Sequence, residues 1–369
     1  MTGMLLPENN RLAFRGGQLP NVGAFARFGK LEHQDFIAEI ERQNQNRQDF
    51  LIEPGEGRFE GLCFKVGSRE FPLDPVAMTT LAERFKVGKG HTVTRRGLVE
   101  LMHNPSLFEE VTNYFFRQLD KPIQFRTLYG VGTAFPSQHY TIVNHADLMG
   151  TVFEILQEVF GVTPTTKFNY MDKSICYSFV PLVGLDDILI RNFKGYEDRI
   201  GIGIEVRNSE ILEHAVTIRF KMIRYICENG HIFADEIGSV YQRHISLTTQ
   251  ELLGNVKLEL ITMFQENLDE LYETLETMKR TLEIRISNGE AYTKEFGRML
   301  DLDNRTVEKL IEIAHIEEDN SLYGWTVGPL SYLASNRIGN RFAQANSEEK
   351  AGLLLSSPDL RERLLSLVD

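Results

Sequence analysis

Basic side chains recur at alternate positions along two neighbouring segments whose pattern is typical of β-strands. Residues 200–207 (IGIGIEVR) and 215–222 (AVTIRFKM) alternate apolar residues with glycine or polar residues. Because successive strand side chains point to opposite faces, Arg207, Arg219 and Lys221 are predicted on one face, opposite the isoleucines. Arginine binds phosphate oxygens through paired N–H donors, so this pattern indicates the binding of a polyanion.

Aromatic and further basic residues surround this predicted hairpin. Tyrosine rings can stack on the bases of a single strand, and cations can bind its phosphates. The candidate nucleic-acid-binding residues are Arg207, Arg219, Lys221, Arg224, Tyr225, Tyr196, Arg199, Arg126, Arg95 and Arg96. Two other interpretations of the polar face stay open: an ordinary solvated face, or a face covered by the acidic helix downstream.

Other chemistries have weaker signals in this chain. Gly88-Lys89-Gly90 lacks the upstream glycine and the following hydroxyl of a phosphate-binding loop. Cys227, His231 and His244, with His214 before them, lack the closely paired spacing of structural metal sites. No nucleophile motif is present, so we expect no catalytic residues, no metal and no cofactor. Asp186-Asp187 could hold Mg²⁺, but adjacent carboxylates in a turn commonly face solvent. A metal-dependent nuclease remains a third possibility.

The elements that position these residues indicate an α+β fold. An antiparallel sheet is expected from the hairpin and from strand-like segments at 59–71, 123–129, 139–143 and 174–180, with helices at about 31–42 and 146–160. We expect a partly loose N-terminal extension over 1–56 and an α+β core over 57–290. A helical region would follow over 291–369, ending in an amphipathic helix at 347–369.

A long helix is predicted from 251 to about 286. Its apolar residues recur at alternating spacings of three and four, as in a heptad repeat: Ile261, Phe264, Leu268, Leu271, Leu275, Met278 and Leu282. The primary expectation is packing within the chain, and an oligomer seam is the alternative. Acidic residues on the opposite side, such as Glu266 and Glu273, are expected to face solvent.

Composition limits the class of protein. The 369 residues are 42% hydrophobic and 25% charged, which is ordinary for a globular chain. The three cysteines (Cys63, Cys176 and Cys227) favour a reducing cytosol over a disulfide framework. No apolar run of about 18 residues and no leader pattern is found, so we expect a cytoplasmic protein with no membrane partner. The net charge of −12 arises after residue 130 and disfavours non-specific nucleic-acid binding.

Several segments together resemble a phage- and plasmid-related family known as domain of unknown function 932. They are 72–87 (PLDPVAMTTLAERFKV), 125–149 (FRTLYGVGTAFPSQHYTIVNHADLM), 203–233 (GIEVRNSEILEHAVTIRFKMIRYICENGHIF) and the pair Arg243-His244. Leu212 or Glu213 stands where the family has a turn glycine. The resemblance spans about 57–300 and implies a mobile-element setting without a defined activity.

The order of elements is also similar to that of phage single-strand annealing proteins. Those proteins pair a curved sheet with a helix and form rings, so this likeness implies a homo-oligomer. The leading hypothesis is a non-enzymatic protein that binds single-stranded DNA in recombination or replication. The alternative is a protein-interaction or assembly protein, such as a host-defence antagonist or a structural oligomer.

Overall fold

The computed structural model shows an α+β fold built around two separate hydrophobic cores. It describes residues 31–329 except 88–90, 162, 172–174, 183–187, 194–195, 212–213, 225–230, 300–301, 318 and 327–328. One core lies between residues 52 and 135. The other joins residues 36–40 to residues 143–325. The segment 57–290 therefore contributes to two cores, and the second of these also takes in residues of the predicted extension and of the predicted C-terminal region.

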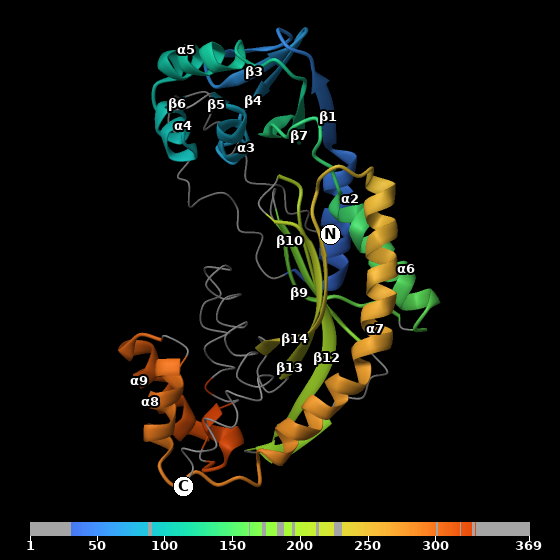
Figure 1. Cartoon of the computed structure of the whole chain (residues 1–369), viewed down its shortest axis with the longest axis vertical. Coiled ribbons are helices and arrows are strands. Elements are labelled where there is room, and N and C mark those ends of the chain that lie inside the picture. The colour runs from blue at the N-terminus through green and yellow to red at the C-terminus, as the bar shows by residue number, and fades with distance from the viewer. Residues whose placement is uncertain are drawn as a thin grey trace, which may run out of the picture.

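The first core belongs to a unit that we call the N-terminal module, residues 47–135 (Figure 1). Its elements are β1 (Arg47–Ile52), β2 (Arg58–Glu60), β3 (Cys63–Val66), β4 (Arg69–Pro72), α3 (Ala77–Arg84), β5 (Lys86–Val87), β6 (His91–Thr92), α4 (Arg95–Leu101), α5 (Pro105–Phe116), β7 (Ile123–Leu128) and β8 (Val131–Ala134). Phenylalanine fills its centre, and the Phe64 and Phe125 rings lie 4.8 Å apart. β1, β7 and β8 form one antiparallel sheet.

A six-stranded antiparallel sheet forms the middle of the molecule. Its strands are β9 (Lys167–Met171), β10 (Ile175–Pro181), β11 (Ile188–Phe193), β12 (Tyr196–Ser209), β13 (Val216–Arg224) and β14 (His231–Gln242). The order is β14-β13-β12-β10-β9, and β11 also pairs with β12. The predicted hairpin is confirmed as β12 and β13, in which Ile204 lies opposite Phe220.

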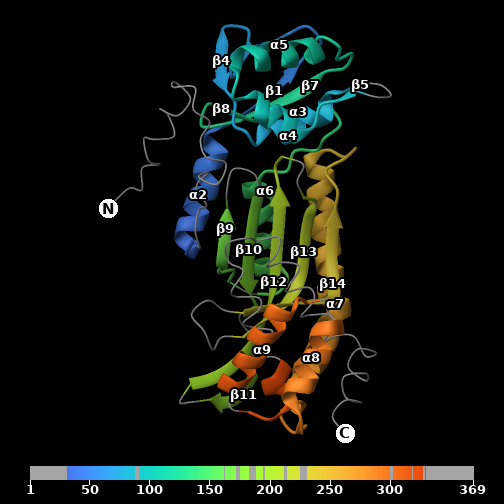
Figure 2. The ribbon, with the colours of Figure 1, turned by 90° about the vertical axis from the view of Figure 1, so that its left-hand side faces the viewer.

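Helices cover one face of this sheet. They are α6 (His145–Glu158) and α7 (Thr249–Arg280), and α2 (His33–Gln45) packs beside α6 and β9. Figure 2 views the sheet with α6 and α7 behind it, and α8 (Gly289–Met299) and α9 (Asn304–Glu317) in front of its lower end. The opposite face of the sheet, which points toward the viewer in Figure 2, has no described helix over its middle. We call it the helix-free face.

The long helix α7 uses its apolar residues within the chain. Phe264, Leu271 and Leu275 are buried in the same core as the sheet, and the Phe264 ring meets Phe220 of β13 at 5.0 Å. These side chains are not exposed for a partner. Within the described residues, no helix combines the length and apolar character that crossing a membrane requires.

The C-terminal helices are tied to the lower end of the sheet. Tyr323 donates a hydrogen bond to buried Asp198 at the start of β12, with 3.1 Å between oxygens, and Arg191 pairs with both Asp198 and Asp319. Gly289 lies so close to Trp325 that an added Cβ would stand 1.9 Å from the indole. Only glycine fits at that contact.

Two local expectations differ from the structure. Residues 139–143 form no strand, and Tyr140 makes only an isolated bridge with Ile245. Within the predicted N-terminal extension, the helix expected at about 31–42 is confirmed as α2, whereas β1 was not expected; apolar side chains of the two elements belong to the two cores. The predicted loose segment at 1–20 and the predicted helix at 347–369 lie outside the described residues.

Candidate nucleic-acid interface

The β12–β13 hairpin separates its apolar and polar residues as its alternation predicts. Ile202, Ile204 and Phe220 are buried in the core beneath α7. The alternate residues Glu205, Arg207, Arg219 and Lys221 therefore project toward the helix-free face. In the strand register Glu205 lies directly opposite Arg219.

The Glu205 carboxylate pairs with three cations of this face. Oε1 of Glu205 accepts a hydrogen bond from Nε of Arg219 at 3.0 Å and forms an ion pair with Nε of Arg207. Its other oxygen forms an ion pair with Nζ of Lys221. Burial would raise the pKa of Glu205, but the charges of Arg207, Lys221 and Arg219 lower it well below its usual range. We call these four residues the Glu205 cluster.

The cluster is more enclosed than the sequence predicted. Lys221 and Glu205 are fully buried, whereas the side chains of Arg207 and Arg219 are 23% and 15% exposed. The expectation that Lys221 contacts a ligand directly is wrong for this conformation, because its ammonium is enclosed with Glu205. The interpretation of this face as a row of freely solvated cations is also wrong, because the two arginines share the Glu205 carboxylate.

Of the other predicted residues, those whose side chains are described lie outside this cluster. Arg199 pairs with Glu197 near the start of β12, at 2.7 Å between Nε and Oε2. Arg95 and Arg96 are exposed at the start of α4, and Arg96 pairs with Glu100. Tyr196 and Arg224 lie at the ends of β12 and β13, where the backbone alone is described, and Tyr225 lies outside the described residues.

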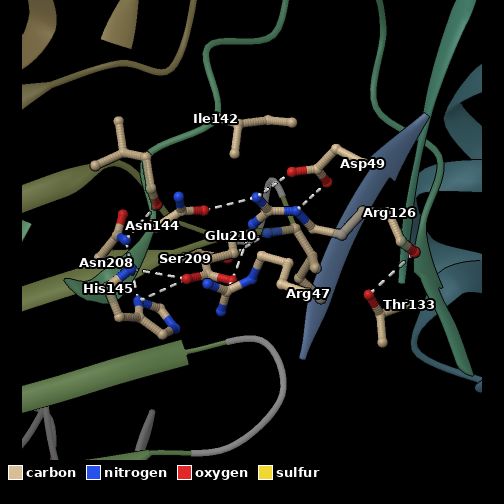
Figure 3. Close-up of polar contacts among 12 residues, drawn as sticks. Arg47, Asp49, Arg126, Thr133, Ile142, Asn144, His145, Asn208, Ser209 and Glu210 are labelled. Atoms are coloured by element: carbon tan, nitrogen blue, oxygen red, sulfur yellow. Dashed lines mark hydrogen bonds and ion pairs between the residues drawn. The ribbon is translucent and has the colours of Figure 1, made fainter. Parts of the chain in front are cut away.

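Arg126 belongs to a second buried cluster, at the junction between the N-terminal module and the sheet (Figure 3). Its Nη1 donates to Oε2 of Glu210 at 2.9 Å, and Nε and Nη2 donate to the two oxygens of Asp49 at 2.7 and 2.9 Å. Arg47 forms an ion pair with the same Glu210 oxygen. Since Arg126 is 1% exposed, its predicted role in contacting nucleic acid is wrong for this conformation.

Glu210 also fixes the start of α6. Its Oε1 accepts the backbone N–H of His145 at 2.8 Å, and Asn144 accepts from Nη2 of Arg126 at 2.8 Å. Burial would raise the pKa of Glu210, yet the nearby charges of His145, Arg126 and Arg47 lower it. The carboxylate therefore stays ionised and links β1, β7, α6 and the end of β12.

Asn208 orients the His145 ring in this junction. The Asn208 amide nitrogen donates to the Val143 carbonyl at 2.8 Å and lies 3.0 Å from Nδ1 of His145. An amide nitrogen only donates, so this contact and the nearby Glu210 carboxylate together orient the ring.

The histidines considered for a metal site have other surroundings. Nδ1 of His244 lies 2.9 Å from the Thr141 carbonyl oxygen, and its ring stacks on Tyr140 at 5.0 Å. Since a carbonyl only accepts, this nitrogen carries the proton. Burial lowers the pKa of both His244 and His214. No group of three metal-ligating side chains occurs among the described residues, and Cys227 and Asp186-Asp187 lie outside them.

Sequence reasoning missed the two acids that organise both clusters. Glu205 lies in the hairpin opposite Arg219. An acidic residue that faces several basic residues across a strand pair is therefore the sequence signal that identifies it. Glu210 had no such signal, because Arg126 lies 84 residues away in the chain. Comparisons with family models, curated proteins and solved structures found no match for this chain.

Proposed function

We propose that this protein binds single-stranded nucleic acid across the helix-free face of its six-stranded sheet. The observation that carries this proposal is the pair Arg207 and Arg219, which stay partly exposed on that face although Glu205 holds both. Phosphate oxygens are suitable acceptors for the N–H donors of a guanidinium at the exposed part of each side chain.

The local positive charge of the Glu205 cluster supports the proposal, although the chain as a whole carries a net negative charge. Three cations and one carboxylate give the four residues of the Glu205 cluster a summed charge of +2, whereas the whole chain carries −12. Fields are screened over about 8–10 Å at physiological salt, so a bound phosphate senses mainly its nearest charges. A flexible single strand can approach this face while its remainder stays away from acidic surfaces.

The arrangement of elements also supports the proposal. β12, β13 and β14 form consecutive antiparallel strands, and α7 follows directly and packs on them. This is the combination of sheet and helix implied by the resemblance to single-strand annealing proteins. That support is an analogy of fold, and the charged side chains carry the functional argument. The proposed setting is recombination or replication of a phage or plasmid.

Fluorescence anisotropy with a labelled oligothymidylate of about 30 nucleotides tests the proposal. We expect affinity to fall with salt, with a log–log slope of about −0.7 for each phosphate neutralised. The double variant Arg207→Gln/Arg219→Gln keeps the buried Glu205–Lys221 pair, so its interior remains charge-balanced. Its slope should be shallower by about 1.4 if each arginine binds one phosphate.

The matched control is Arg58→Gln/Arg298→Gln, which removes two exposed, ion-paired arginines elsewhere in the chain. The control should keep the wild-type slope. Wild-type protein that does not bind the oligonucleotide would refute the proposal, as would equal slopes for wild type and the Arg207/Arg219 variant. A further variant, Arg95→Gln/Arg96→Gln, measures whether the N-terminal module contributes.

A further inference from the structure

Tyr241 is an exposed aromatic residue at the end of edge strand β14. It is 57% exposed. Its neighbours in the chain face the helices: Val240 is buried in the core, and the Gln242 amide bonds to Glu259 of α7. Because strand side chains alternate, Tyr241 projects toward the helix-free face, the same face as the Glu205 cluster.

The strand register places Tyr241 in one row with Arg207. Thr217 of β13 lies opposite Arg207 on one side and opposite Tyr241 on the other. Neighbouring strands are about 4.8 Å apart, so the Cα atoms of Arg207 and Tyr241 are separated by roughly 10 Å across the sheet. The adjacent row contains Glu205, Arg219 and Ser239 in the same order.

Both rows end in an exposed side chain at β14. Glu205 is fully buried, Arg219 is partly exposed and Ser239 is exposed. Thr217 is half-buried and Tyr241 is exposed. The helix-free face therefore opens to solvent at the β14 edge. A strand bound at the arginines can leave the protein in that direction.

Packing against the described residues does not account for the Tyr241 ring. Among those residues it has no aromatic neighbour and no hydrogen-bond partner. An exposed ring beside a cationic pair is the combination that binds single strands, because bases stack on the ring while phosphates meet the cations.

We propose that Tyr241 stacks on a base of the bound strand, whose backbone crosses the sheet from Arg207 and Arg219 toward β14. This inference rests on the proposed function and deepens it. It assigns phosphate contacts to the arginines and a base contact to the tyrosine. Since every base has a π-face, the contact gives affinity for single strands without strong sequence preference.

The test compares wild type, Tyr241→Ala and Tyr241→Phe on two labelled strands of equal length. One is oligothymidylate, and the other has the same backbone with abasic sites throughout. On oligothymidylate, Tyr241→Ala should bind roughly 5- to 150-fold more weakly, whereas Tyr241→Phe should bind within about twofold of wild type. On the abasic strand, wild type and Tyr241→Ala should bind equally.

The matched control is Tyr114→Ala, since Tyr114 is 63% exposed on α5 of the N-terminal module. It should not change affinity for either strand. Failure of wild type to bind oligothymidylate would overturn the proposed function itself. Normal wild-type binding with an unchanged Tyr241→Ala affinity would overturn only the role of Tyr241, as would an equal loss on the abasic strand. Unchanged thermal melting of each variant confirms that it is folded.

Discussion

Replacing Glu205 by glutamine should destabilise the fold through the cations that it leaves behind. Lys221 is fully buried and the two arginines are mostly buried, so solvent cannot compensate for the lost carboxylate. Removing one partner of a buried ion pair typically costs about 3–5 kcal/mol. We expect a loss of that size in the free energy of unfolding of the unit that contains the six-stranded sheet.

Trp325 provides the assay, because it is the single tryptophan and is buried in the same core as β12. Urea unfolding followed by its fluorescence reports on that core. The double variant Glu205→Gln/Lys221→Met removes one charge of each sign. It should recover at least half of the lost free energy of unfolding, because a neutral, well-packed replacement of a buried ion pair is often tolerated. Glu197→Gln, on the same strand, breaks an exposed pair and should cost about 1 kcal/mol or less.

The pH dependence gives the same prediction an independent check. The folded-state pKa of Glu205 is lowered below the unfolded value of about 4.3, so its stabilisation is complete above that pH and is lost as the pH falls. The stability difference between wild type and Glu205→Gln should therefore shrink below about pH 4.3. A loss under about 1 kcal/mol at neutral pH, or a double variant as unstable as the single one, would refute a central role for Glu205.

Two further outcomes follow from the remaining charged and thiol groups. Glu210→Gln leaves Arg47 and Arg126 buried without the carboxylate that they share. Amide hydrogen exchange should therefore increase in β1, β7 and the start of α6. The control variant Glu197→Gln should leave the exchange of these amides unchanged. Protection equal to wild type would contradict the junction role of Glu210. Burial, together with the Glu70 carboxylate, raises the pKa of Cys63 to about 11, so its thiol should react with a disulfide reagent at pH 8 much more slowly than glutathione does. Reaction as fast as glutathione would contradict the raised pKa.

Local pattern alone determined much of the fold of this protein. The alternation in 200–207 and 215–222 identified the hairpin and the face that each residue takes, because a strand has a side-chain period of two. The three-four spacing after residue 251 predicted a long helix, and α7 forms over Thr249–Arg280 with Phe264, Leu271 and Leu275 buried, since packing one face of a helix requires such spacing. These features depend on neighbours within a few residues.

Only the tertiary structure decided which charges are accessible and which neutralise one another. Lys221 was predicted at the surface, but register and packing enclose it with Glu205. Arg126 was predicted as a ligand contact, but it meets Asp49 and Glu210 from segments 77 and 84 residues away. Tyr241 became a candidate only when pairing placed it in a row with Arg207. The sequence determines which side chains are charged. The partners of each charge and its contact with water depend on distances that only the folded chain defines.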